Sequence, residues 1–370
     1  MPPSTIDRLF AEMLHHGDDR LEPGDPLAPP IVPASIYHLP GDPAGAYQYG
    51  RWSNPSWSAL EEALSVLEQA ETVLFPSGMA AIAALFYTQL RPGDRLLLPA
   101  DGYHTTRLFA EKYLAGAGIA VETAATADLA EQILTGVRLI FIETPSNPGL
   151  DVCDLAPTIA KAQAANCLVI VDNTTATPLG QRPLDLGADA VISADTKAIN
   201  GHSDALLGHV ASRNPELIAQ IRDWRRIAGA IPGSFEAWLV HRGLKTLELR
   251  HDRMCASAQT IAERLVGHRQ VRRLRYPGLP TDPAHAVARR QMARFGSLIG
   301  LTLASKEHAE RFISAAKFVR AATSFGGIQT SAERRARWGD KVADGFVRLS
   351  IGCEPVEALW ADLSEALDGL

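Results

Sequence analysis

The feature that most constrains this chain is an alternation of short apolar runs with amphipathic stretches, which continues to about residue 230. The runs expected to be strands are TVLF (72–75), DRLLLP (94–99), IAVET (119–123), VRLIFIE (137–143), CLVIVD (167–172) and AVISA (190–194). Amphipathic stretches such as WSALEEALSVLEQ and DLAPTIAKAQAA alternate with them. This pattern predicts an α/β fold with a mainly parallel sheet flanked by helices.

The flanking segments predict three parts of the chain. Residues 1–45 are dense in proline and glycine, which predicts an extended N-terminal arm. Residues 46–235 hold the predicted parallel sheet. Residues 236–370 begin in a long helical stretch and contain the strand patterns SLIGLTL and FVRLSIG, which predicts a smaller C-terminal α/β domain.

Composition excludes several classes of function. The formal net charge of -6 disfavours nucleic acid or an anionic membrane surface as the main partner. No apolar run approaches the roughly 20 residues that span a bilayer, and no secretory signal is found at the N-terminus. The cysteines lack the close spacing of zinc sites and are too few for a disulfide scaffold; they are Cys153, Cys167, Cys255 and Cys353. We therefore expect a cytoplasmic protein without a structural metal.

Three polar signals follow predicted strands, where ligands of parallel sheets bind. Asp172 ends the run LVIVD, Lys197 follows AVISADT, and the amides of Gly78 and Met79 open a predicted helix, whose positive end attracts anions. Each signal alone is more often a helix cap, a solvated lysine or a turn glycine. Together they match pyridoxal 5'-phosphate (PLP), which needs an anion cradle, a Schiff-base amine and a carboxylate beside its pyridine nitrogen.

Eight motifs in order add a resemblance: YGRWSNPS, FPSGMAAI, DGYHTTRLF, ETPSNP, VDNTTATPL, TKAINGHSD, SFGG and VRLSIGCE. From about IVPASIYHLP to the C-terminus, the chain resembles the Cys/Met-metabolism PLP enzymes: cystathionine γ-lyase, β-lyase and γ-synthase, and methionine γ-lyase. Its ending is similar to bacterial cystathionine γ-lyases. The resemblance implies a fold type I PLP-dependent transferase, a PLP-binding domain at 46–235 and a homotetramer, a dimer of dimers with shared active sites.

The resemblance also implies site residues. Cofactor-binding positions would be Tyr49, Arg51, Gly78, Met79, Tyr103, Asn147, Asp172, Thr196 and Lys197. Lys197, Tyr103 and Asp172 would be catalytic, and Tyr49 and Arg51 would reach the phosphate of a neighbouring subunit.

Ser324 and Arg348 would lie near the substrate carboxylate. Arg348 also has a physical argument, because a guanidinium on an apolar strand needs a carboxylate partner if it faces the interior. An outward-facing position is the alternative.

Departures from the family leave alternatives open. Ala194 and Asp195 stand where many relatives have serine and a small residue, so the hydroxyl of Ser193 is the alternative phosphate donor. Thr323 replaces a glutamate of several γ-acting relatives, and the loop HTTRLF is similar to some β-lyases. The basic segment AERRARW (332–338) is expected to be a solvated helix face.

The predicted reaction is γ-elimination of L-cystathionine, a small sulfur amino acid, to cysteine, 2-oxobutanoate and ammonia. The alternatives are a β-lyase that releases homocysteine and pyruvate, a γ-synthase and a methionine γ-lyase. A non-catalytic PLP-fold binding protein is a further alternative. The retention of Lys197, Asp172, Tyr103 and Arg348 argues against it.

Overall fold

The computed structural model describes residues 5–370, which form two compact units. The first unit comprises the chain up to Leu90 together with Asp189–Leu247, and the second comprises Arg91–Ala188 with Glu248–Leu370. These limits differ from the predicted division at residues 45 and 235, which stays a prediction. The first four residues of the predicted arm lie outside the described residues.

The strands agree with the apolar runs in the sequence. In residues 5–370 they are β1 (Glu71–Phe75), β2 (Arg95–Pro99), β3 (Ala120–Ala124), β4 (Leu139–Glu143), β5 (Leu168–Asp172), β6 (Ala190–Ser193), β7 (Gly208–Ser212), β8 (Arg273–Arg275), β9 (Leu298–Thr302), β10 (Arg320–Ala321), β11 (Ser331–Arg334) and β12 (Phe346–Ser350). The six runs named for the first sheet are confirmed as β1 to β6. Strand β7 was not expected.

The helices of the described chain are α1 (Thr5–Leu14), α2 (Pro55–Glu68), α3 (Gly78–Gln89), α4 (His104–Phe109), α5 (Leu155–Ala164), α6 (Thr177–Gly180), α7 (Pro215–Ala228), α8 (Ser234–Leu244), α9 (Leu247–Leu265), α10 (His285–Gln291), α11 (Lys306–Ala315) and α12 (Val356–Asp368). None of them is long and apolar enough to cross a membrane. The long helical stretch predicted after residue 232 is divided into α8 and α9.

In the first unit three strands pair in the order β1-β7-β6, and both pairings are antiparallel. Helix α1 packs against α2 through the buried side chains of Leu9, Phe10 and Met13. This helix is a difference from the extended arm expected there. Residues 21–54 contain only turns, bends and one isolated pairing between Ile36 and Tyr49.

In the second unit four strands pair in the order β5-β4-β2-β3, and every one of these pairings is parallel. The mainly parallel α/β prediction is therefore confirmed. The parallel register places Glu143, the last residue of β4, beside Asp172, the last residue of β5. Two carboxyl groups thus lie together at the carboxyl end of the sheet.

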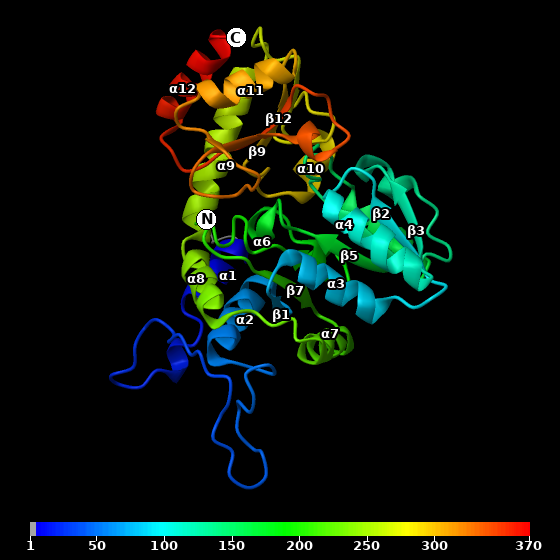
Figure 1. Cartoon of the computed structure of the whole chain (residues 1–370), viewed down its shortest axis with the longest axis vertical. Helices are drawn as coiled ribbons and strands as arrows, with labels where there is room; N and C mark the ends of the chain where they lie inside the picture. Colours follow the sequence, from blue (N-terminus) through cyan, green and yellow to red (C-terminus); the bar gives the residue numbers. More distant parts are fainter. Residues whose placement is uncertain (1–4) are drawn as a thin grey trace. The chain divides into compact units, whose positions relative to one another are not determined.

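The second unit also holds a five-stranded sheet in the order β10-β11-β12-β9-β8. Figure 1 shows α9, α11 and α12 gathered around this sheet. Their apolar faces and the strands form one core, to which α11 contributes Phe312, α12 contributes Leu363, and the strands contribute Leu301 and Val347. This core holds β12, the strand that carries Arg348, in a fixed position.

Strand β7 lies close to the start of α3, and glycines make this approach possible. A Cβ added to Gly208 would lie 2.6 Å from the Cα and backbone nitrogen of Gly78. A Cβ added to Gly78 would lie 2.8 Å from the Cβ of Ala194. Because real side chains do not tolerate such distances, the backbones of α3, β6 and β7 can meet here only without a side chain at 78 or 208.

We expect Gly208→Ala to destabilise the protein by about 1–3 kcal/mol, because the new methyl group must push α3 away from β7. Gly116→Ala is the matched control, since a Cβ at Gly116 would meet no atom within 4 Å. Thermal unfolding of both variants measures the difference. Equal melting temperatures for the two would contradict the close contact between Gly208 and Gly78.

Candidate functional site

The first unit positions Lys197 in a turn after β6. The amide of Lys197 donates to the carbonyl of Ala194 at 3.0 Å, and its own carbonyl accepts from the amide of Gly201 at 2.8 Å. The hydroxyl of Thr196 bonds both the amide and the carbonyl of Leu207 at 3.1 Å. The turn is therefore fastened at its base to the residue that precedes β7.

The start of α3 has the features of an anion site. The hydroxyl of Ser77 caps the helix by accepting from the amide of Ala80 at 3.1 Å. Gly78 and Met79 are the first two residues of this twelve-residue helix. The amides of a first helical turn point out of the helix end, where the helix dipole is positive. Gly78 packs against Ala194, which begins the turn that carries Lys197; we call this turn the lysine turn. The start of α3 and the lysine turn therefore lie close together in the first unit.

Tyr49 and Arg51 lie outside the sheet of this unit. Arg51 donates to the backbone carbonyl of Arg226 at the end of α7. Its guanidinium lies 5.4 Å from the ring centre of Tyr49, whose side chain is exposed. The structure thus groups these two predicted residues with each other.

The second unit contains the other predicted residues, and Glu143 connects two of them. One carboxylate oxygen of Glu143 accepts the amide of Tyr103 at 2.6 Å, and the other accepts the amide of Asn147 at 2.7 Å. Glu143 and its neighbour Asp172 are both buried. The sequence analysis missed Glu143, although it opens the ETPSNP motif. Its position at the end of an apolar strand was the available signal.

The two buried carboxyl groups lie close enough for the charge of one to affect the other. Burial raises the pKa of Glu143, and the nearby charge of Asp172 raises it further, to about 8. The two amide donors act in the opposite direction and lower this pKa. Asp172 accepts the amide of Thr174 at 2.9 Å. Two carboxylates side by side do not both ionise easily, so at neutral pH Glu143 holds a proton.

Arg348 lies on β12 with its side chain buried, as the inward-facing alternative required. It donates to the side-chain oxygen of Asn147 at 2.5 Å and to the backbone carbonyl of Thr323 at 2.6 Å. It also donates to a carboxylate oxygen of Glu333 at 3.1 Å. Burial and then the charge of Arg335 lower the pKa of Arg348 to about 10, so it is still cationic at neutral pH. Ser324 lies beside this group and contributes a longer carbonyl contact at 3.3 Å.

Glu333 corrects the interpretation of AERRARW as a solvated helix face. The segment is a strand, β11, followed by a short 3₁₀ helix at residues 335–338. Arg335 is buried and binds Glu333 at 2.7 Å and Asp340 at 2.6 Å, while Arg337 binds Glu333 at 2.9 Å. The prediction was wrong because the charges of this segment are paired with one another inside the protein.

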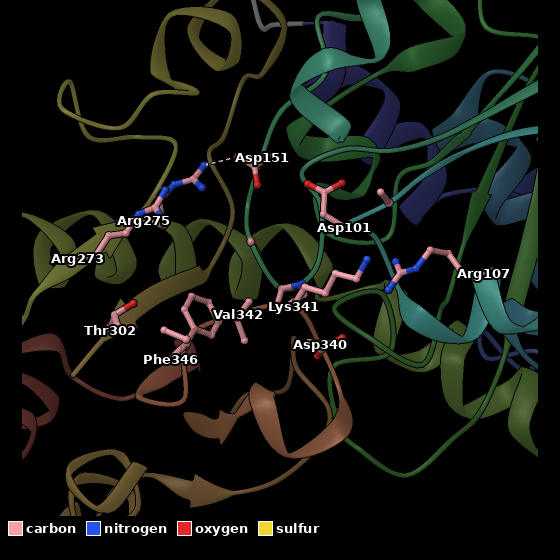
Figure 2. Close-up of a pocket in the computed structure, with 14 residues that line it drawn as sticks. Asp101, Arg107, Asp151, Arg273, Arg275, Thr302, Asp340, Lys341, Val342 and Phe346 are labelled. Carbon is pink, nitrogen blue, oxygen red and sulfur yellow. Dashed lines mark hydrogen bonds and ion pairs between the residues drawn. The ribbon is translucent and has the colours of Figure 1, made fainter. Parts of the chain in front are cut away.

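The second unit also has a cavity of about 460 Å³ beside these loops. Figure 2 shows the side chain of Lys341 extending into this cavity on the side of Arg107. The charged lining residues are Asp101, Arg107, Asp151, Arg273, Arg275, Asp340 and Lys341.

Several of these charges are already balanced. Asp151 pairs with Arg275 at 3.0 Å, and Asp340 pairs with Arg335 outside the lining. Arg107 instead donates to a backbone carbonyl, that of Gly102. The cavity therefore presents acidic and basic groups together, next to the residues that precede Tyr103 and follow Asn147.

Comparisons with known proteins agree on one family. The chain matches the family described as Cys/Met metabolism PLP-dependent enzyme over residues 11–368. It is 51% identical over 351 residues to a putative cystathionine gamma-lyase from Streptomyces coelicolor, covering 93% of this chain and 89% of that protein. It is 37% identical over 388 residues to an L-methionine gamma-lyase from Pseudomonas deceptionensis, covering 96% of both. A solved cystathionine gamma synthase from Xanthomonas oryzae, in complex with cystathionine, superposes with a TM-score of 0.93 at 35% identity, covering 99% of this chain and 98% of that one.

The pKa of Glu143 predicts a pH dependence of stability. Its folded value of about 8 lies above its ordinary value of 4.5, so the folded protein holds a proton that the unfolded chain releases. The free energy of unfolding should then fall as pH rises from 5.5 to 8, by up to about 3 kcal/mol from this group.

Glu143→Gln cannot release a proton and should remove this part of the pH dependence. The measurement is thermal unfolding of both proteins at pH 5.5 and 8.5. A stability difference between them that stays the same at both pH values would exclude a raised pKa at Glu143.

Proposed function

Because the chain belongs to the Cys/Met metabolism PLP-dependent enzyme family, we propose that it is a carbon–sulfur lyase that cleaves L-cystathionine by γ-elimination. The products are cysteine, 2-oxobutanoate and ammonia. The name of the Streptomyces relative, which is half identical over nearly the whole chain, supports this choice within the family.

The observation that carries the proposal is the charged cavity. L-cystathionine has an amino-acid group at each end, whereas methionine ends in an apolar methylthio group. A cavity with carboxylates such as Asp101 and cations such as Arg107 and Lys341 suits a second ammonium and a second carboxylate. An apolar end group would gain nothing from these charged side chains, whereas an end group with its own ammonium and carboxylate can pair with them. Arg107 and Asp101 were not singled out in the sequence analysis.

The residues of each unit fit PLP. In the first unit, the close packing at Gly78 keeps side chains away from the start of α3, so a phosphate can approach its backbone amides. In the second unit, Asp172 is a buried carboxyl group at the end of a strand, which suits a protonated pyridine nitrogen. The residues proposed to hold the cofactor are Tyr49, Arg51, Gly78, Met79, Tyr103, Asn147, Asp172, Thr196 and Lys197.

Each catalytic residue has a proposed task. Bound PLP supplies an electron sink for the negative charge that develops at the substrate Cα. The Nζ atom of Lys197 would take the proton from Cα, release it to the bound cofactor, and so be free to take a second proton from Cβ. The hydroxyl of Tyr103 gives a proton to the departing γ-sulfur. Asp172 holds the proton at the pyridine nitrogen.

Arg348 is proposed to bind the α-carboxylate of the substrate. Its contact with Glu333 does not neutralise it, because Glu333 is shared with Arg335 and Arg337. Glu333 therefore fixes the guanidinium in position while the group retains a net attraction for an incoming carboxylate. Asn147 orients the other side of the same guanidinium.

Mass spectrometry of the products formed from L-cystathionine tests the reaction. We expect cysteine and 2-oxobutanoate. Homocysteine and pyruvate would identify a β-lyase instead. Lys197→Ala should reduce turnover by at least about a hundredfold, because the variant loses its proton carrier. The same variant should keep the unfolding temperature of the apo protein, and normal turnover in it would overturn the assignment of Lys197.

We also propose a cytoplasmic homotetramer in which Tyr49 and Arg51 reach the cofactor phosphate of a neighbouring subunit. The support is their place outside the sheet of their own unit, after a segment without helices or strands. In the described chain none of the four cysteines forms a disulfide, which fits the cytoplasm.

A subunit-mixing experiment tests the shared site. Arg51→Ala and Lys197→Ala would damage different halves of it, so a heterodimer has one intact site out of two. Random mixing of the two inactive variants should therefore restore about a quarter of the activity. If subunit exchange is demonstrated and no activity returns, each chain completes its own site.

A further inference from the structure

A buried charged cluster lies directly behind the lysine turn and has no part in the mechanism above. The imidazole of His209 bonds a carboxylate oxygen of Asp195 at 2.7 Å and lies 3.5 Å from a carboxylate oxygen of Glu68. His209 and Asp195 are completely buried, and Glu68 is nearly so. Asp195 immediately precedes Thr196 and Lys197 in the chain. We call Asp195, His209 and Glu68 the buried triad.

The buried triad is placed where three parts of the first unit meet. Successive residues of a strand point to opposite faces, so Gly208 and His209 of β7 contact different partners. Gly208 lies against Gly78 at the start of α3, while His209 bonds Asp195 at the base of the lysine turn. Glu68, the last residue of α2, approaches the imidazole from its other nitrogen. A short stretch of β7 thus connects the lysine turn with the start of α3.

His209 supplies the buried triad with a positive charge only while it is protonated. Burial lowers the pKa of His209, but the carboxylates of Asp195 and Glu68 together raise it to about 10. Burial raises the pKa of Asp195, and the positive charge of His209 opposes that rise. Because an imidazole is a stronger base than a carboxylate, the proton stays on His209 at neutral pH.

Stability alone does not explain such a cluster. Apolar residues of similar volume usually replace a buried ion pair with little loss, since burying the charges is itself unfavourable. What a hydrogen-bonded charged pair adds is direction, because it fixes one backbone relative to another at a defined distance and angle. Here the two backbones are that of the turn carrying Lys197 and that of β7. Strand β7 in turn packs against the start of α3 at Gly78.

We propose that Asp195 and His209 are positioning residues. They hold the turn carrying Thr196 and Lys197 at a fixed position relative to the start of α3. The cofactor would need both at once, since the lysine would bond its aldehyde while the helix amides bind its phosphate. This inference rests on the proposed role of Lys197. It predicts that disturbing the buried triad weakens cofactor binding, although none of its three side chains is a cofactor ligand.

The test is the dissociation constant of PLP, measured by titrating apo protein and following the visible absorption of the bound cofactor. The triple variant Glu68→Gln/Asp195→Ala/His209→Leu removes all three charges together, so no buried carboxylate is left without its cation. We expect the apo variant to unfold within about 4 °C of the unchanged protein. We expect its dissociation constant to rise at least about tenfold, and the pH midpoint of the visible band to shift.

A matched control separates this effect from a general loss of packing. His241→Leu makes the same substitution at another buried histidine of the first unit, whose side chain contacts His16 instead of the turn. It should leave the dissociation constant unchanged. If the folded triple variant also binds PLP with the dissociation constant and pH midpoint of the unchanged protein, the buried triad is only a packing element and the proposal is wrong.

A second pair of variants decides the question if the triple variant does not fold. Asp195→Asn keeps an acceptor for the imidazole N–H and should bind PLP within about threefold of the unchanged protein, whereas Asp195→Ala should lose at least about tenfold. Equal constants for the two would overturn the proposal. None of these measurements uses a substrate, so they are independent of whether L-cystathionine is cleaved. A Lys197→Ala variant that binds PLP normally would refute the role of Lys197 instead.

Discussion

The chemistry of the second unit depends on the contact between two carboxyl groups at adjacent strand ends. Parallel pairing of β4 and β5 forces Glu143 and Asp172 together. Burial and the nearby charge of Asp172 raise the pKa of Glu143 to about 8, so Glu143 holds a proton at neutral pH. Glu143 in turn fixes two loops, because it accepts the amides of Tyr103 and Asn147. A single register thus assigns a structural task to one carboxyl group and an electrostatic task to its neighbour.

On β12, too, the charge of one residue depends on how its neighbours share their charges. Arg348 is positioned by a carboxylate that also serves two other arginines, so the local balance stays positive. If a guanidinium were paired with a carboxylate that had no other partner, that carboxylate would neutralise its charge before any substrate bound. The sharing of Glu333 is what allows Arg348 to be both buried and attractive to an anion.

The sequence could predict the parts of this protein that depend on local periodicity. Apolar runs located β1 to β6, and the α/β class and the PLP-dependent family were confirmed, with solved enzymes of fold type I as structural neighbours. Strand β7 was missed because valine and alanine are the only apolar residues of GHVAS, and its burial comes from its place between β1 and β6 and from contacts with α3. Periodicity reports which face is buried, not which partner is found there.

The charged segments show the same limit more sharply. Arg335 looked solvent-facing because its sequence neighbours are charged, and its partners Glu333 and Asp340 are apparent only in three dimensions. Asp195 stood out as an unusual residue before the lysine, but His209 lies fourteen positions later and gave no matching signal. The sequence alone does not show which two charged residues form a pair when they lie in separate segments that meet only in the folded protein.

The first unit consists of two separate segments of the chain, so the ribosome synthesises its parts at different times. The strand β1 pairs with β7, and Phe75 meets Gly208 only after about 130 more residues have been made. At about 5–20 residues per second, that interval lasts roughly 7 to 27 seconds. During it, the apolar residues of β1 have been synthesised without the strand that will cover their backbone. The apolar residues of β1 are therefore vulnerable to aggregation while residues 91–188 are being translated, before the turn that carries Lys197 has been made.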